Sequence, residues 1–400
     1  MEGKSKAFKY TMFGLLYFSQ GTILSYFTAL NALYLLDKGL ELDNIGILGT
    51  IAMIPFILKI FLGILSDKVN LFGKGHRKPY ILIGLFIQVI SLLLVTLIDP
   101  GETFWLFVVA AFFVQFGMAL YDTCTDGLAL DTIPKAEEGI IQTFMVGGRA
   151  VGLIATATVV GLIAENVSWD AVFYTLAAFT LFPLPFVLMV KDGERPAGRR
   201  FDPKAFRAFG KKNVLSSAAM GFIIFFIIVG INQIVNPYLS DPVEGFGISL
   251  SMAGMLTTVW GIGILAGSIF GGRLFDQLDK RTVTLISIGL SIFSLVCLAF
   301  VPTITLAWVF MFVFGFSYGT YQTVYFAMAM NITEAAIAAS MFSILMSVTN
   351  LGQAVGMAAT GSAAKNLGYQ TTFLIFAGLN LFLLPLFRPA FGKERQSNEN

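Results

Sequence analysis

Four ionisable side chains lie inside long apolar stretches of this sequence, where a charge is costly: Lys59, Asp122, Asp126 and Arg149. Asp122 and Asp126 are four residues apart, so they share one face of a helix. Two carboxylates this close compete for ionisation, and one of them holds its proton more strongly. Two acids and two bases at similar depth can also neutralise one another. The group therefore indicates either a proton-coupling site or a fixed cluster of ion pairs without transport chemistry.

A second group of polar side chains is neutral and follows helical spacing. Tyr318, Tyr321, Gln322 and Tyr325 share one helical face at intervals of three and four residues. Such an aromatic and amide lining suits an organic solute with ring or sugar character better than an inorganic ion. The alternative is that these side chains only join helices to one another. Other apolar stretches carry the remaining members of the group, which are Gln20, Tyr26, Asn31, Gln115, Asn232, Gln233 and Asn236.

Several kinds of chemistry lack the residues that they need. His76 is the only histidine, which excludes a zinc site or a histidine-based triad. The segment 3–5 (Gly-Lys-Ser) lacks the preceding glycine and strand of a phosphate-binding loop. Cys124 and Cys297 lie in separate apolar stretches and indicate no disulfide framework. We therefore expect neither an enzyme nor a bound metal or cofactor, and energy has to come from a gradient or from exchange.

The composition places these residues in a membrane. Hydrophobic residues make up 56% of the 400 residues and charged residues 12%, which is about half the charged share of a soluble protein. The net charge of +2 leaves no basic domain to neutralise phosphates. We expect membrane lipids around the protein and no nucleic-acid partner.

Apolar segments long enough to span a bilayer, about 20 residues each, recur along the chain. They predict an all-α membrane protein with twelve transmembrane helices in two six-helix halves. The first apolar run is too long for a signal-peptide core, so we expect it to be retained as a membrane helix. The predicted spans are 10–36, 45–66, 79–98, 103–129, 139–164, 170–190, 214–239, 249–275, 282–301, 304–330, 336–364 and 370–388.

Lys and Arg are unevenly distributed over the predicted loops. Most of the 26 basic residues fall on the side of the N-terminus, whereas the opposite loops carry mainly Asp and Glu. Basic loops stay in the cytoplasm, so we predict that both termini of this plasma (inner) membrane protein are cytoplasmic. The predicted domains are a six-helix bundle at 1–190, a basic connector at 191–213, a second bundle at 214–389 and a polar cytoplasmic tail at 390–400.

A short motif occurs at equivalent places in the two predicted halves. Each copy reads Gly-x-x-x-Asp at the end of a helix and is followed by basic residues before the next helix. Internal repeats of this kind are typical of secondary transporters, although ordinary helix-end charge is the alternative. The copies consist of Gly63, Asp67, Lys68, Arg77 and Lys78, and of Gly272, Asp276 and Arg281.

This repeated motif resembles the loop motif of the major facilitator superfamily. The resemblance implies two six-helix halves, alternating access, a cytoplasmic latch at the motif residues and a monomer. It also implies a central cavity lined by helices 1, 4, 7 and 10, which are the predicted helices that carry the neutral polar residues. In the first half, the segment 55–67 resembles both the muropeptide permease and acetyl-CoA transporter group and the folate–biopterin transporter group, and the segment 65–80 is especially similar to the folate–biopterin transporter group. The segments 121–127 and 148–152 are more similar to the muropeptide permease and acetyl-CoA transporter group.

Glycines spaced by four residues predict close contacts between helices. They lie on three predicted helices that the resemblance places between the two halves, where smooth contacts would let the halves rock. These glycines are Gly148 and Gly152, Gly263, Gly267 and Gly271, and Gly352 and Gly356.

Together these features predict a secondary active transporter for a small organic solute, coupled to protons by symport or antiport. Asp122 and Asp126 would couple, while Lys59 and Arg149 would set their ionisation or hold an anionic group of the substrate. The alternative is a transporter-like membrane protein that acts as a sensor or assembly factor. A membrane-embedded enzyme is disfavoured because the catalytic residues are missing. Substrate, direction and coupling ion stay open.

Overall fold

The structure is a computed structural model that describes residues 2–71, 75–133, 138–190, 207, 210–332, 338–387 and 390. Most of the predicted basic connector and the tail from 391 onward lie outside the described residues. The same holds for the side chains of Asp67 and Asp276 in the two copies of the repeated motif.

All regular structure in the described ranges is helical. Eleven helices there are long and apolar enough to cross a membrane, so the chain is a multi-pass membrane protein. Helix α1 is not among the eleven, and the expected twelve crossings stay a prediction. The first half contains α1 (Glu2–Ala29), α2 (Asn31–Asp37), α3 (Leu42–Ile57), α4 (Lys59–Lys68), α5 (Lys78–Val95), α6 (Phe104–Thr132), α7 (Glu138–Asn166), α8 (Trp169–Thr180) and α9 (Leu184–Met189). The second half contains α11 (Lys212–Ser240), α12 (Leu250–Gln277), α13 (Lys280–Ala299), α14 (Ile304–Asn331), α15 (Ala338–Leu367), α16 (Tyr369–Leu379) and the 3₁₀ helix η4 (Asn380–Leu386).

Four of the predicted spans are interrupted. The first breaks at Leu30 between α1 and α2, and the second at Leu58 between α3 and α4. Pro55 lies inside α3 just before that second break. Proline has no N–H and its ring crowds the preceding turn, which bends or ends a helix. Pro183 lies at the third break, between α8 and α9. The fourth span changes from α16 to the 3₁₀ helix η4 after Leu379, and Pro385 lies inside η4.

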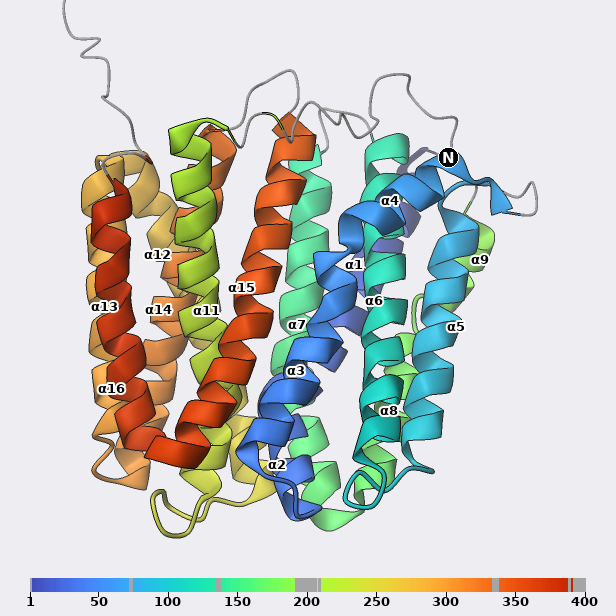
Figure 1. Cartoon of the computed structure of the whole chain (residues 1–400). Helices are drawn as coiled ribbons and strands as arrows, with labels where there is room; N and C mark the ends of the chain where they lie inside the picture. Colours follow the sequence, from blue (N-terminus) through green and yellow to red (C-terminus); the bar gives the residue numbers. More distant parts are fainter. Residues whose placement is uncertain are drawn as a thin grey trace, which may run out of the picture.

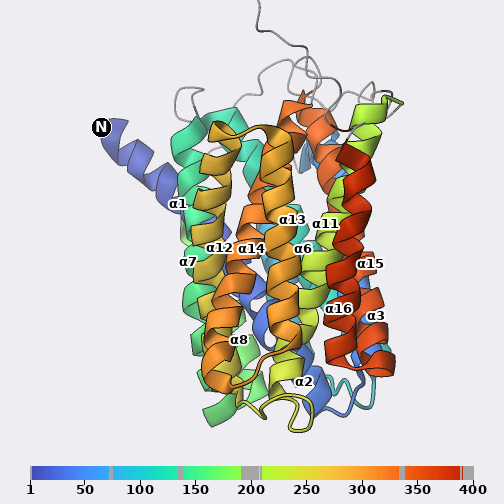
Figure 2. The same cartoon turned by 90° about the vertical axis from the view of Figure 1, so that its left-hand side faces the viewer.

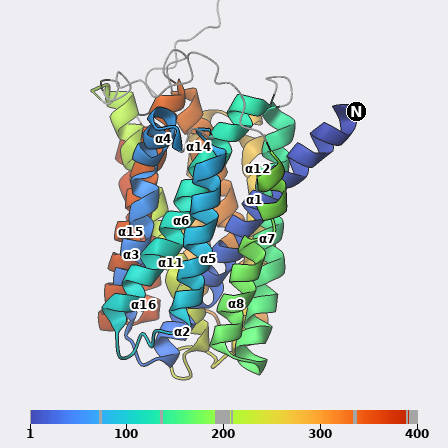
Figure 3. The same cartoon turned by 90° about the vertical axis from the view of Figure 1, so that its right-hand side faces the viewer.

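The helices form two bundles side by side, one from each half of the sequence (Figure 1). Figure 2 faces the second half, with α12, α13 and α16 toward the viewer, and Figure 3 faces α5 and α8 of the first half. The N-terminal end of α1 leans away from the bundle in both views.

The two halves repeat the same close helix contacts. A Cβ at Gly148 or Gly152 of α7 would overlap the backbone of α1 at Gly14 or Phe18. In the second half, a Cβ at Gly352 or Gly356 of α15 would overlap the backbone of α11 at Phe222 or Phe226. The spacing is four residues on all four helices, so α1 and α7 correspond to α11 and α15.

The repeated motif shows the same correspondence. A Cβ on Gly63 of α4 would lie 3.4 Å from the Cγ2 atom of Thr123 on α6. A Cβ on Gly272 of α12 would lie 3.9 Å from the Cγ2 atom of Thr323 on α14. The internal repeat therefore extends from the sequence to the packing of its helices.

The glycines expected between the halves pack within them instead. Besides the two pairs just described, Gly263, Gly267 and Gly271 lie against α14, which belongs to their own half. Contacts between the halves use other glycines. A Cβ at Gly46 of α3 would lie 2.7 Å from the carbonyl oxygen of Met357 on α15. A Cβ at Gly161 of α7 would lie 2.7 Å from the carbonyl oxygen of Leu250 on α12. The spacing of four marks close packing but does not say which helix is the partner.

The charged side chains that link the two halves in the described part of the chain lie at the end of the molecule opposite the N-terminal end of α1. Neutral hydrogen bonds also link the halves nearer the middle, from Asn350 of α15 to the carbonyl oxygen of Phe56 at 3.0 Å and between the hydroxyls of Thr158 and Thr258 at 2.9 Å. Lys365 of α15 pairs with Asp43 of α3 at 2.9 Å and also with Glu41. The backbone N–H of Ser251 donates to Glu165 of α7 at 2.7 Å. α3 and α15 lie side by side at that end (Figure 1).

Candidate functional site

Lys59 and two carboxylates form an ion cluster inside the first half. The Lys59 ammonium lies 3.1 Å from a carboxylate oxygen of Asp126 and is also bonded to Asp122. Asp122 and Asp126 lie one helical turn apart on α6, which explains how one ammonium reaches both. Lys59 is the first residue of α4. The break after α3 therefore sets where this side chain starts.

Helix α1 completes the cluster with two neutral donors. The Gln20 amide donates to Asp122 over 2.6 Å, and the Tyr17 hydroxyl donates to Asp126. Gln20 was predicted as a cavity residue, whereas Tyr17 was not predicted. Its signal was the spacing of three residues, which puts Tyr17 and Gln20 on the same face of α1.

The two carboxylates differ in their access to water. The Asp126 side chain is 39% exposed and that of Asp122 only 10%. With both carboxylates ionised, a single ammonium leaves the cluster one negative charge in excess. Uptake of a proton or another cation would remove that charge, and Asp126 is the more exposed of the two carboxylates.

Arg149 does not join this cluster. Its side chain is exposed, and it forms no ion pair within the described part of the chain. It interacts electrostatically with Tyr17 and Tyr121 of the first half and with Tyr318 of the second. The structure thus brings together three of the four ionisable residues and leaves the fourth outside the cluster.

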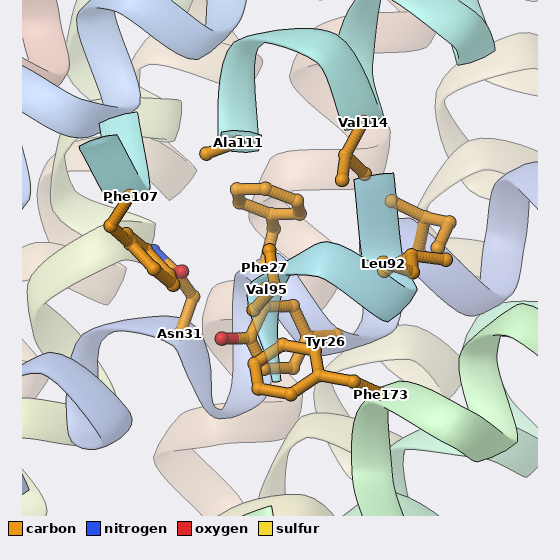
Figure 4. Close-up of a pocket in the computed structure, with 10 residues that line it drawn as sticks. Tyr26, Phe27, Asn31, Leu92, Val95, Phe107, Ala111, Val114 and Phe173 are labelled. Atoms are coloured by element: carbon orange, nitrogen blue, oxygen red, sulfur yellow. The ribbon is translucent and has the colours of Figure 1, made fainter. Parts of the chain in front are cut away.

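Two of the predicted cavity residues line a pocket inside the first half (Figure 4). The Tyr26 hydroxyl and the Asn31 carbonyl oxygen have no hydrogen-bond partner among the described residues. Apolar side chains of α5, α6 and α8, among them Leu92, Phe107 and Phe173, form the remaining walls. Gln115 is also buried, and its side-chain oxygen likewise has no partner in the described ranges.

The stripe predicted on α14 divides between the core of the second half and its surface. The Tyr321 hydroxyl donates to Asn380 at 3.2 Å, and Tyr325 packs against Gly221 of α11. Tyr318 is half-buried with its ring 5.2 Å from that of Trp260. Gln322 is also half-buried.

On α11, the predicted amides mostly contact the other half. The Asn236 side chain donates to the carbonyl oxygen of Ala29 at 3.0 Å and to the hydroxyl of Thr257 at 2.9 Å. Gln233 lies close to Gly49 of α3, and Asn232 is half-buried. In this conformation Asn236 therefore holds the two halves together.

The first copy of the repeated motif is built around a buried arginine. Arg77 donates to Asp131 of α6 at 3.1 Å and to the Ser66 hydroxyl of α4 at 2.7 Å. It joins α4 and α6 at the start of α5. Lys78 donates to the carbonyl oxygens of Leu188 and Val190 at the end of α9. The bases Lys68 and, in the second copy, Arg281 are exposed.

Both the sequence and the fold are similar to those of known proteins. The model of a family described as the Major Facilitator Superfamily matches residues 12–240 and 221–400. The chain is 25% identical over 272 residues to the sialic acid transporter NanX of Escherichia coli, covering 66% of this chain and 64% of that protein. It is 23% identical over 393 residues to a Rickettsia typhi protein named as transporter AmpG 2, covering 94% and 93%.

The first-half resemblances are confirmed. AmpG represents the muropeptide permease group. The folate–biopterin transporter of Synechocystis is 29% identical over 210 residues, which cover 50% of this chain and 42% of that protein.

Two solved structures show the fold. A mutant form of the nucleoside transporter NupG matches with a TM-score of 0.78 and 20% identity, covering 96% of this chain and all of that chain. A D-xylose–proton symporter matches with a TM-score of 0.73 and 18% identity, covering 95% and 96%.

Proposed function

The chain belongs to the major facilitator superfamily, and on that premise we propose that it is a secondary active transporter that moves a small organic solute by alternating access, coupled to protons. The proteins that it matches are transporters and not enzymes, and so is this chain. The observation that carries the proposed coupling is a single ammonium, Lys59, shared by two carboxylates within the first bundle.

In the proposed architecture, residues 1–190 and 214–389 act as two six-helix bundles around a central solute path. The connector 191–213 and the tail 390–400 lie on the cytoplasmic face of the inner membrane together with both termini. The excess of Lys and Arg on that face supports this orientation. The protein works as a monomer, and Arg77 and its counterparts in the second copy of the motif act as the cytoplasmic latch.

The contacts between the halves support alternating access. The ion pairs among them lie where Lys365 meets Asp43, which is the outer end in the proposed orientation. This arrangement corresponds to a state that is closed outward. Transport would require these contacts to separate while the halves approach each other at the opposite end.

Asp126 is the proposed proton acceptor. It is the more exposed carboxylate, so water can deliver a proton to it. Protonation removes one of the two negative charges that compete for Lys59, which leaves a balanced pair of Lys59 and Asp122. Tyr17 and Gln20 hold the two carboxylates in place from α1. The name of the D-xylose–proton symporter, a fold neighbour, agrees with coupling of this kind.

Flux into proteoliposomes tests the proposal. The purified protein would be assayed with N-acetylneuraminate, folate, uridine and xylose, with and without an inward proton gradient. We expect saturable, gradient-driven accumulation of at least one solute. Absence of saturable flux for the whole set would refute transport and favour the sensor or assembly role.

Substitution of the carboxylates tests the coupling. Asp126→Asn should abolish gradient-driven accumulation while exchange across the membrane continues. Asp170→Asn, which changes an exposed carboxylate at the start of α8, is the matched control and should accumulate normally. Unchanged pH dependence in both Asp126→Asn and Asp122→Asn would remove these residues from coupling.

A further inference from the structure

Arg149 is exposed although it lies in the middle of a buried helix face. Met145 and Leu153 are one turn before and after it on α7, and Thr156 is one turn further; all three are at most 6% exposed. Residues three and four apart share a helix face. The Arg149 side chain therefore starts from a helix face that is mostly packed inside the protein.

This face of α7 is turned toward the second half, because Leu153 lies against Gly261 of α12. Arg149 interacts electrostatically with Tyr17 and Tyr121 of the first half and with Tyr318 of the second. The nearby acids are already engaged, because Lys59 is bonded to both Asp122 and Asp126. An arginine at such depth ordinarily pairs with an acid or a carbonyl group. Here no ion pair of Arg149 occurs within the described residues.

The equivalent position of the second half behaves differently. Gly152 and Gly356 make corresponding contacts, so Arg149 corresponds to Gln353. The Gln353 side chain donates to Asn350 at 3.1 Å. At this position of the repeat, the second half thus has a neutral amide, Gln353, that is hydrogen-bonded within its own helix. The first half has the guanidinium of Arg149 there, which has no ion pair within the described residues.

Given the proposed transport function, we propose that Arg149 binds a carboxylate of the transported solute, which is therefore an organic monoanion. A guanidinium offers two parallel N–H groups that match the two oxygens of a carboxylate. The half-buried Tyr318 ring, paired with Trp260, offers an aromatic surface for the body of the solute.

Charge balance favours a monoanion over a phosphate ester. Lys59 and Arg149 together carry two positive charges, and Asp122 and Asp126 two negative ones. A proton on Asp126 removes one negative charge, and one bound carboxylate restores it. The loaded site then carries the same net charge as the empty site. A phosphate monoester would bring about −1.5 to −2 charges and leave an excess.

Matched acid and neutral ligands test this assignment. Thermal unfolding of the purified full chain would be followed with N-acetylneuraminate and its methyl ester, and with glucuronate and glucuronamide. We expect an acid to stabilise the wild-type protein and its neutral partner to give no shift. Arg149→Gln should raise the half-saturating concentration of the acid by at least about tenfold, which is the change expected when a hydrogen bond to a charged group is lost. Arg149→Lys should lose less, and Lys212→Gln, an exposed base at the start of α11, should lose nothing.

The outcomes separate this inference from the proposed transport function. Equal stabilisation by an acid and its neutral partner, or unchanged acid affinity in Arg149→Gln, would overturn the inference while leaving proton-coupled transport intact. Acid binding that depends on Arg149, together with no flux of any tested solute, would support a carboxylate site at Arg149 and refute transport. If a pH gradient drives accumulation of the acid and the membrane potential does not, this would support binding of one proton together with one carboxylate, which leaves the net charge of the site unchanged.

Discussion

Replacing Arg77 should destabilise the first half strongly, because its charge is paired inside the protein. The Arg77 side chain is 10% exposed and that of its partner Asp131 only 6%. Removing one member of a buried ion pair costs about 3–5 kcal/mol, since the other charge stays buried without a partner. The bond from Arg77 to Ser66 is lost as well.

The expected effect can be expressed as a melting temperature. For a unit of 150–250 residues, 1 kcal/mol corresponds to about 2–4 °C. If the first bundle unfolds as a unit, Arg77→Gln should lower its melting temperature by about 6–20 °C. The measurement is loss of monodisperse protein on heating in detergent, followed by size-exclusion chromatography.

Two further variants make the result decisive. Arg77→Gln combined with Asp131→Asn should recover much of the loss, because no buried charge is then left without a partner. Lys68→Gln removes an exposed base of the same motif and should change stability by no more than about 0.5 kcal/mol. The reasoning fails if Arg77→Gln melts like Lys68→Gln, or if the double variant is no more stable than Arg77→Gln alone.

Two other predictions follow from the contacts of the helices. Gly152→Ala should destabilise by about 1–3 kcal/mol, because the added Cβ overlaps the backbone of α1. Gly147→Ala, where a Cβ meets nothing within 4 Å, should be neutral or slightly stabilising in the same thermal assay; equal losses would contradict the packing argument. Lys365→Ala should loosen the closed end, seen as faster maleimide labelling of a cysteine at Ala358 beside Gly46. Lys38→Ala, whose pair with Asp99 lies within the first half, should leave that rate unchanged, and identical rates in both variants would speak against a lock at Lys365.

Helix positions were predictable because the bilayer imposes a length on every apolar segment. The predicted span 214–239 is matched by α11 at Lys212–Ser240, for example. The breaks were harder to predict, although Pro55 gave a signal for the one before Lys59. Hydropathy measures only whether a segment can cross, and a kinked helix crosses as well as a straight one.

The grouping of Lys59 with Asp122 and Asp126 was also predictable, since buried charges require neutralisation. What periodicity could not supply is the direction in which each polar face points. Tyr321 and Tyr318 share a stripe in the sequence, yet one is buried against Asn380 and the other remains half-exposed. The rotation of a helix about its axis depends on all of its neighbours, as the glycines that pack within each half also demonstrate.

The correspondence between the halves shows where their roles differ. Thr123 and Thr323 occupy equivalent places, so Asp122 corresponds to Gln322 and Asp126 to Phe326. Gly63 contacts Thr123 and Gly272 contacts Thr323, so the two glycines correspond. Lys59 and Ser268 each lie four residues before these glycines and therefore correspond as well. Every ionisable member of the proposed coupling site thus has an uncharged counterpart, while the glycine contacts are duplicated. Within the described residues, the close helix packing is thus shared by both halves, whereas the charged cluster belongs to the first half alone. In the proposed mechanism, a proton bound in the first half therefore acts on the second half only through the contacts between them.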